Sequence, residues 1–120
     1  MKNILVVAGI LLVAFSTPGF ASDDVVILIN PFVVPSGKLD ETISMWEQAR
    51  DYLQKQPGYI STALHQSVAD DAHYRLINVA KWSSIELYQA ATKKMRTEAG
   101  LPRIEGVMPN PGLYRVIRRD

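Results

Sequence analysis

The 120-residue sequence contains no cysteine, so it can form neither a disulfide bond nor a thiol nucleophile. It also lacks a glycine-rich phosphate loop, a Gly-x-Ser-x-Gly elbow and a paired histidine–acid metal motif. A net charge of only +1 gives no electrostatic reason to expect nucleic acid or an anionic membrane as a partner. The sequence therefore excludes thiol chemistry and offers no motif for a nucleotide or a metal.

The N-terminus has the pattern of a secretory signal peptide. Lys2 precedes an apolar run of 12 residues, Ile4 to Phe15, and small residues follow at Gly19 and Ala21. The run is too short for a comfortable membrane span, although an uncleaved anchor is the alternative. We expect a signal peptide over residues 1–21 and a mature domain over residues 22–120. The protein would then be periplasmic or secreted, without stable membrane insertion after cleavage.

Hydrophobic periodicity predicts a β-α-β-β-α-β order in the mature chain. This order is the ferredoxin-like arrangement, in which two helices cover one face of a four-stranded antiparallel sheet. A capping box of Ser83 and Glu86 predicts the start of the second helix. Pro31 predicts a bulge or an edge in the first strand, because proline cannot donate a backbone hydrogen bond. The expected elements are a strand at 25–34, a helix at 38–56, strands at 59–67 and 73–82, a helix from 83 to about 95, a loop at 97–112 and a last strand at 113–118.

The first strand is apolar on both of its faces. Val25 to Ile29 contains no polar residue, yet the two helices of this fold cover only one face of the sheet. An antiparallel sheet with a bare face would alternate apolar and polar residues instead. A second copy of the chain is the economical cover for the other face, so we expect a homodimer.

Two segments carry a resemblance to a known family. The segments PGYISTALHQS and HYRLINVAKWSSIELYQAAT resemble the antibiotic biosynthesis monooxygenase domain in a hairpin, an Asn-Val-Ala-x-Trp-x-Ser motif and a short helix. The resemblance implies a dimeric α/β barrel. It also implies a monooxygenase that oxidises phenolic molecules with O₂, without metal or flavin. A related branch binds and degrades haem.

The resemblance implies that Asn78, Trp82 and Tyr88 are the catalytic residues. The Asn78 amide can donate to a phenolate or enolate oxygen, Trp82 can stack on a flat ring, and Tyr88 can hold or relay a proton. The alternative is structural, since a strand-end tryptophan and a helix tyrosine commonly belong to the core and an asparagine can satisfy a strand bulge.

Four more residues are candidates for substrate binding: Asn30, Trp46, His65 and Arg103. Asn30 matches an asparagine beside the ligand of haem-degrading relatives, or it bonds to backbone next to Pro31. His65 is either a general base or an exposed strand histidine. Arg103 is one residue out of step with an arginine of the phenol-oxidising members. No metal ligands are expected.

The leading functional hypothesis is an exported, cofactor-independent monooxygenase acting on a flat, hydrophobic, phenolic or quinol-like molecule. No cofactor is expected, because the second helix, SIELYQAATKKM, lacks the histidine that haem-degrading relatives use to bind iron. The first alternative is a dimer of the same fold that binds a hydrophobic ligand or haem without catalysis. The second is a structural dimer whose cavity is filled by its own side chains.

Overall fold

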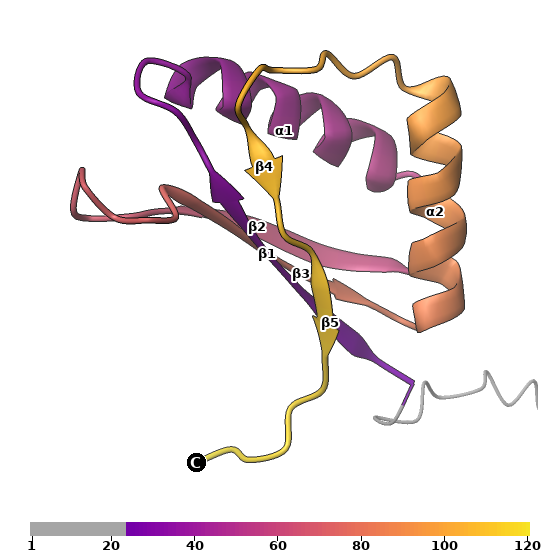
Figure 1. Ribbon diagram of the computed structural model, residues 1–120. Helices are drawn as coiled ribbons and strands as arrows, with labels where there is room; N and C mark the ends of the chain where they lie inside the picture. Colours follow the sequence, from indigo (N-terminus) through magenta and orange to yellow (C-terminus); the bar gives the residue numbers. More distant parts are fainter. Residues whose placement is uncertain (1–23) are drawn as a thin grey trace, which may run out of the picture.

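The structure, a computed structural model, describes residues 24–120, so the predicted signal peptide lies outside the described residues. One antiparallel sheet carries two helices on the same face, and the predicted ferredoxin-like fold is confirmed (Figure 1). Within residues 24–120, neither helix combines the length and the hydrophobicity that crossing a membrane requires. The elements are β1 (Val26–Val33), α1 (Leu39–Leu53), β2 (Tyr59–Gln66), β3 (Leu76–Trp82), α2 (Ile85–Glu98), β4 (Met108–Pro109) and β5 (Gly112–Tyr114).

The register between β1 and β3 decides which side chains lie under the helices. Strand order is β2-β3-β1-β4, with β5 also paired to β1. The β1–β3 pairing runs without a shift from Val26 opposite Trp82 to Phe32 opposite Leu76. Paired residues in antiparallel strands point to the same face, and these four residues are all buried. The even-numbered residues of β1 and β3 therefore face the helices.

Pro31 is accommodated in a central strand because one side of β1 is locally open. On that side β5 pairs with Ile27 to Ile29 and β4 pairs with Phe32 and Val33, so no strand residue pairs with Pro31 there. The Pro31 carbonyl accepts a hydrogen bond from the Asn110 amide, 2.9 Å away, in the link between β4 and β5. Because the N–H and C=O of one strand residue point to the same side, the donor that proline lacks would have faced this break.

The last strand is shorter than the sequence predicts. A strand was expected at 113–118, but β5 ends at Tyr114, which pairs with Ile27. Because β1 begins only one residue before Ile27, little of it remains to pair with the chain beyond Tyr114. Residues 115–119 instead line a cavity on the helix-free side of the sheet. The predicted loop at 97–112 also contains the short strand β4, so the sheet has five strands rather than four.

Helix α2 begins one residue later than the predicted capping box. Ser84 is the N-cap, and its hydroxyl accepts a hydrogen bond from the Leu87 amide at 3.2 Å. The backbone N–H of Ser83 donates to the Gly58 carbonyl at 2.8 Å, which fixes Ser83 to the turn before β2. Ser83 therefore belongs to the end of β3, and the prediction that it caps the helix was wrong.

The core lies between the helices and one end of the sheet. Trp82 is 1% exposed and is the largest fully buried side chain of the described residues. Around it are the buried residues Val26, Leu28, Ala80 and Ala91, with the partly buried Leu53, Tyr59, Ile85, Tyr88 and Leu113 packed against them. This cluster fixes α2 on β1 and β3 at the end of the sheet where Tyr88 lies.

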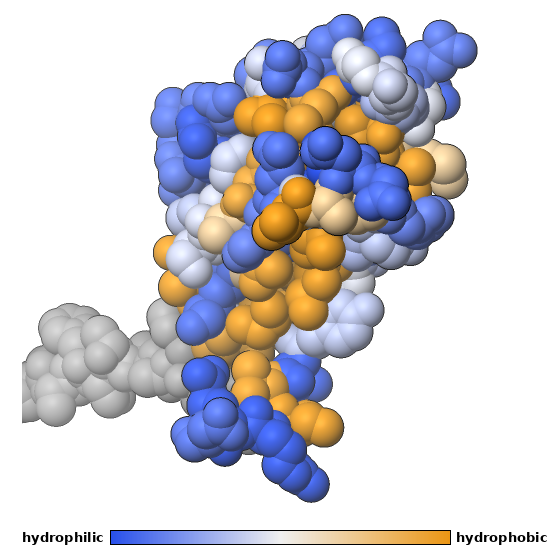
Figure 2. All heavy atoms as spheres, turned by 90° about the vertical axis from the view of Figure 1, so that its left-hand side faces the viewer, coloured by the Kyte–Doolittle hydropathy of each residue, from blue (hydrophilic) through white to orange (hydrophobic). Residues whose placement is uncertain are grey.

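The opposite face of the sheet has no helix over it. The odd-numbered residues of β1 and β3, among them Ile27, Ile29, Ile77 and Val79, lie on this face and are only partly buried. Figure 2 views the molecule from the left-hand side of Figure 1 and shows a broad hydrophobic band bordered by hydrophilic side chains. A band of this kind on a sheet face usually marks a contact with another molecule.

Gly58 is required at the turn that brings Ser83 and α2 together. Its φ is +90°, and a Cβ added there would lie 2.5 Å from Leu87 Cβ. Gly37 provides a comparison, because its φ is +80° but the space around it is open. Both glycines therefore have a backbone conformation that other residues rarely adopt. Only Gly58 is also packed too closely to accept a side chain.

We expect Gly58→Ala to lower the free energy of unfolding by about 3 kcal/mol, from backbone strain plus overpacking. Gly37→Ala should cost about 1 kcal/mol, because only the strain applies. Urea denaturation of both variants checks this. Equal losses for the two would show that close packing of Gly58 against α2 does not matter.

Candidate functional site

Asn78 is a buried polar residue in the middle of the helix-facing sheet surface. It is 9% exposed and lies between Leu76 and Ala80 on that face of β3. Its Oδ1 accepts a hydrogen bond from the Thr62 hydroxyl on β2, at 2.7 Å. A buried amide must be hydrogen-bonded to offset its loss of hydration, and this contact satisfies one end of it.

Asn30 lies directly opposite Asn78 on the neighbouring strand. The two are Cα partners in the β1–β3 register, so both side chains belong to the helix-facing surface. Asn30 Oδ1 accepts a hydrogen bond from the backbone N–H of Asn110 at 2.9 Å. The backbone contact expected as the structural alternative for Asn30 is thus present, and it leaves the NH₂ end of the side chain for another partner.

Trp82 is held in place by two tyrosine rings. Tyr59 lies edge-on to it with ring centroids 5.7 Å apart, and Tyr88 packs similarly at 5.6 Å. Edge-to-face pairs of this kind add to the energy gained from burial. With 1% of its surface exposed, Trp82 is part of the core in this structure. Its ring contacts the Tyr88 ring and therefore helps to fix the position of Tyr88.

Tyr88 lines a cavity of about 310 Å³ between α2 and the segment before β5. The cavity is lined by Tyr88, Gln89, Thr92, Arg96, Pro111, Gly112 and Leu113; Asn78 and Trp82 are not among its lining residues. Burial raises the pKa of the Tyr88 hydroxyl above its ordinary value of 10, and the positive charge of Arg96 acts in the opposite direction. Tyr88 therefore keeps its proton at neutral pH.

Arg96 is a residue of this cavity that the sequence analysis missed. Residues 88, 92 and 96 are spaced four apart, so they lie on one face of α2. That spacing was readable from the sequence. The expected arginine was instead Arg103, which lines a different cavity of about 410 Å³ against α1. The structure therefore brings Arg96, and not Arg103, to Tyr88.

His65 lies on the other face of the sheet from Asn78. It pairs with Ile77, is exposed, and its Nδ1 lies 3.2 Å from the Ile77 carbonyl oxygen. The register shifts between Tyr59 and Ser61, so a β-bulge reverses the alternation of β2 after Tyr59. The structure therefore does not bring His65 to Asn78.

Trp46 lies on α1 and packs against the guanidinium of Arg50, whose Cζ is 5.4 Å from the ring centroid. This arrangement is a cation–π contact between residues one helical turn apart. Trp46 is only partly buried, so its ring retains exposed surface. Among the described contacts, none links Trp46 to Asn78 or Tyr88.

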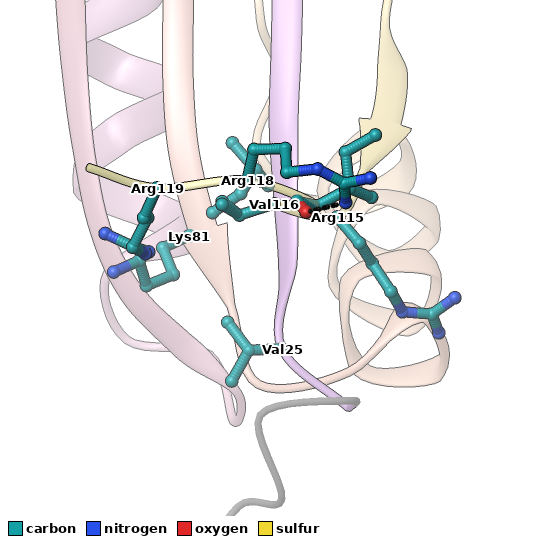
Figure 3. Close-up of a pocket in the computed structure, with 8 residues that line it drawn as sticks. Val25, Lys81, Arg115, Val116, Arg118 and Arg119 are labelled. Carbon is teal, nitrogen blue, oxygen red and sulfur yellow. Dashed lines mark hydrogen bonds between the residues drawn. The ribbon is translucent and has the colours of Figure 1, made fainter.

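A separate cavity of about 500 Å³ lies on the helix-free side of the sheet (Figure 3). It is formed where the C-terminal segment passes Val25, Ile27 and Lys81. Figure 3 shows Lys81 and Arg119 on one side of this cavity, with Arg115 directed away from them. Arg118 donates to the Ile117 carbonyl at 2.6 Å. This cavity combines apolar walls with positive charge and contains none of the predicted site residues.

Residues 24–120 contain no group of three or more His, Cys, Asp or Glu side chains placed to hold a metal ion. The polar groups near Asn78 are amides and hydroxyls, which are hydrogen-bonding groups for a small organic molecule. The chemistry of this donor set suits an oxygen atom that gains negative charge.

The comparison with known families decides the assignment. Residues 25–95 match the sequence profile of the antibiotic biosynthesis monooxygenase family, more than half of the chain. The chain belongs to this family. The matched region contains Asn30, Asn78, Trp82 and Tyr88, and it ends just before Arg96. Curated proteins provide no match to the chain.

Solved structures of other proteins have a similar fold. A candidate monooxygenase from Shewanella loihica PV-4 is 51% identical, has a TM-score of 0.74, and the alignment covers 80% of this chain and 97% of that one. SnoaB, a cofactor-independent oxygenase from Streptomyces nogalater, is 20% identical with a TM-score of 0.62 over 80% and 96% of the two chains. MhuD, a haem degrader from Mycobacterium tuberculosis, is 21% identical with a TM-score of 0.61 over 79% and 98%.

The raised pKa of Tyr88 predicts a loss of stability at high pH. Above about pH 10 the unfolded chain loses the Tyr88 proton while the folded chain retains it, so unfolding becomes easier as pH rises. Tyr88→Phe removes this effect. The difference in free energy of unfolding between the wild-type protein and Tyr88→Phe should therefore shift in favour of the variant between about pH 8 and about pH 11. Tyr114→Phe, the same chemical change at an exposed position, is the control. A difference between wild type and Tyr88→Phe that stays constant with pH would contradict the account.

Proposed function

We propose that this protein is an exported monooxygenase that oxidises a flat, hydrophobic, phenolic or quinol-like molecule with O₂, without a metal or organic cofactor. The observation that supports this most is the buried Asn78 amide on the helix-facing surface, directly opposite Asn30. Family membership supplies the reaction class. The similarity in fold to SnoaB, a cofactor-independent oxygenase, is consistent with the absence of a cofactor.

The electrons for this reaction come from the substrate. A phenolic substrate with an activated CH₂ group, such as an anthrone, loses a proton to give an enolate, and the enolate reduces O₂. One oxygen atom bonds to the carbon and the other leaves as water, so CH₂ plus O₂ becomes C=O plus H₂O. Asn78 donates a hydrogen bond to the enolate oxygen and stabilises the negative charge as it develops.

Tyr88 acts in this proposal as a proton donor. Its hydroxyl has an ordinary pKa of 10, which burial raises further, so at neutral pH it is protonated and can donate to an oxygen atom but is a poor base. Trp82 keeps the Tyr88 ring in position through their edge-to-face contact. His65 lies on the other face of the sheet, so the first proton passes to solvent rather than to His65 in this scheme.

Haem degradation has less support in this chain. MhuD shares the fold and is a haem degrader, but α2 contains no histidine to bind iron. The haem-free reaction is therefore the function that the residues favour.

Pairing of two copies through the helix-free face is part of the proposal. The partly buried Ile27, Ile29, Ile77 and Val79 form an apolar surface that a second copy would cover. Export is proposed from the signal pattern in residues 1–21. The enzyme would then act on a substrate outside the cytoplasm.

Oxygen consumption tests the function directly. With an anthrone or a hydroquinone as substrate, the wild-type protein should consume O₂, and Asn78→Ala should lower kcat by about 100-fold, because the variant loses the donor to the enolate oxygen. Ser61→Ala, a change on the other face of β2, is the control. Tight ligand binding without O₂ consumption would favour a carrier. The absence of both ligand binding and O₂ consumption would contradict the proposal.

A further inference from the structure

Arg96 is the only charged residue among those that line the cavity beside Tyr88. This cavity of about 310 Å³ lies between α2 and residues 111–113, and its other lining side chains are apolar, hydroxyl or amide groups. None of the ion pairs within residues 24–120 includes Arg96. A guanidinium keeps its positive charge at any ordinary pH and presents a planar fork of N–H donors. Arg96 therefore brings an uncompensated positive charge to the cavity.

The acid nearest to Arg96 in the sequence is held by the other helix. Glu98 lies two residues beyond Arg96, and its Oε2 accepts a hydrogen bond from the Tyr52 hydroxyl on α1 at 2.8 Å. Residues two apart on a helix do not face each other. The other acid of α2, Glu86, lies in the first turn of the helix, whereas Arg96 lies in the last. Neither carboxylate of α2 is therefore placed to neutralise Arg96.

Helix geometry directs the Arg96 side chain back toward Tyr88. The Arg96 backbone is about 12 Å beyond that of Tyr88 along the axis of α2, on the same face. Side chains of a helix tilt toward its N-terminus, so the long side chain of Arg96 covers the turn that contains Thr92. Burial raises the pKa of the Tyr88 hydroxyl, and the charge of Arg96 acts against this rise. The guanidinium is thus close enough to influence the hydroxyl.

The remaining walls of the cavity suit a flat ring. The hydroxyl proton of Thr92 is shared between the carbonyl oxygens of Tyr88 and Gln89, at 3.0 and 3.1 Å, so it is occupied within the helix. The wall facing α2 consists of Pro111, Gly112 and Leu113, which offer no charged side chain. The cavity therefore has apolar surface for a ring and one cationic side chain for an acidic group.

We propose that Arg96 is a specificity-determining residue that selects an aromatic carboxylate, with the carboxylate on the guanidinium and the ring toward Tyr88. A planar carboxylate matches a planar guanidinium through two parallel hydrogen bonds, and a single positive charge matches a monoanion. A phosphate monoester carries nearly two negative charges, one of which this cavity would leave uncompensated. The assignment rests on the proposed function for the phenolic part of the ligand, and it adds the acidic group.

The alternative for Arg96 is a structural role, because a cation in the last turn of a helix interacts favourably with the helix dipole. That role would affect stability but would not make binding depend on the charge of the ligand. Lys93 provides a matched control, because it is an exposed cation on the same helix that does not line the cavity. Arg96→Gln and Lys93→Gln remove the same charge from α2.

The test compares 4-hydroxybenzoate with 4-hydroxybenzamide, which have nearly the same shape and differ in charge. By isothermal titration calorimetry at neutral pH, the wild-type protein should bind the benzoate about tenfold more tightly, as expected for hydrogen bonds to a charged group. Arg96→Gln should abolish this preference, and Arg96→Lys should keep part of it because the charge remains without the planar fork. Lys93→Gln should leave it unchanged. Equal wild-type affinities for the two ligands, or an unchanged preference in Arg96→Gln, would overturn the proposal.

Titration of Tyr88 provides a second measurement that needs no ligand. The pKa of Tyr88, followed by the ¹³C signals of labelled tyrosine rings and assigned with Tyr88→Phe, should rise further in Arg96→Gln, because the charge that opposes the effect of burial is gone. Lys93→Gln should leave it unchanged. The same Tyr88 pKa in wild type and Arg96→Gln would show that the guanidinium does not reach the cavity, and it would overturn the proposal.

The role of Arg96 and the enzymatic function fail separately. With 2,5-dihydroxybenzoate as substrate, Arg96→Gln should raise KM about tenfold and change kcat by less than about twofold, because the contact is made equally in the ground and transition states. Charge-dependent binding without O₂ consumption from 2,5-dihydroxybenzoate, an anthrone or a hydroquinone would support the role of Arg96 and contradict the monooxygenase. O₂ consumption with equal KM values for 2,5-dihydroxybenzoate and 2,5-dihydroxybenzamide would support the monooxygenase and overturn the role of Arg96.

Discussion

The structure depends on the fact that β1 is apolar on both faces while the chain has helices for only one. Val26, Leu28 and Phe32 are buried beneath the helices, whereas Ile27 and Ile29 lie on the helix-free face. Burial of apolar surface is the main favourable contribution to folding, and leaving an apolar sheet face in water forfeits part of it. The same strand therefore builds the core on one face and leaves an apolar surface on the other, through which we propose that two copies pair.

The buried face of β1 also determines the chemistry available to the protein. Asn30 and Asn78 interrupt an otherwise apolar surface of β1 and β3 at one paired position, and each accepts a hydrogen bond from a residue distant in the sequence. Burying an amide costs free energy unless it is hydrogen-bonded, and the oxygen ends of both amides have partners in the protein.

Much of this arrangement could be read from the sequence. Alternation in 76–82 placed Asn78 and Trp82 on one face, and the both-sided hydrophobicity of the first strand indicated the uncovered face. Details that depend on how the strands pair could not be predicted from the sequence. The bulge after Tyr59 reverses which residues of β2 face the helices, so the face of His65 followed only from the three-dimensional register. The hydrogen bond from Thr62 to the Asn78 amide likewise could not be predicted, because the two residues are 16 positions apart in the sequence.

The two boundaries that were predicted wrongly are decided by contacts with other segments of the chain. Ser83 and Ser84 are both good N-cap residues, and the contact of Ser83 with Gly58 decides between them. The last strand was expected through Arg118, but β1 begins too late in the chain to pair with residues beyond Tyr114. In both cases the outcome was set by a distant segment of the chain, which local periodicity does not contain.

The state of association in solution tests the central claim most directly. Sedimentation velocity of residues 22–120 at micromolar concentration should show a single species with the mass of two protomers, because the proposed pairing would bury the apolar face that carries Ile27, Ile29, Ile77 and Val79. A stable species with the mass of one protomer at that concentration would contradict the account. The sheet would then tolerate a bare apolar face, and pairing through it would have to be given up.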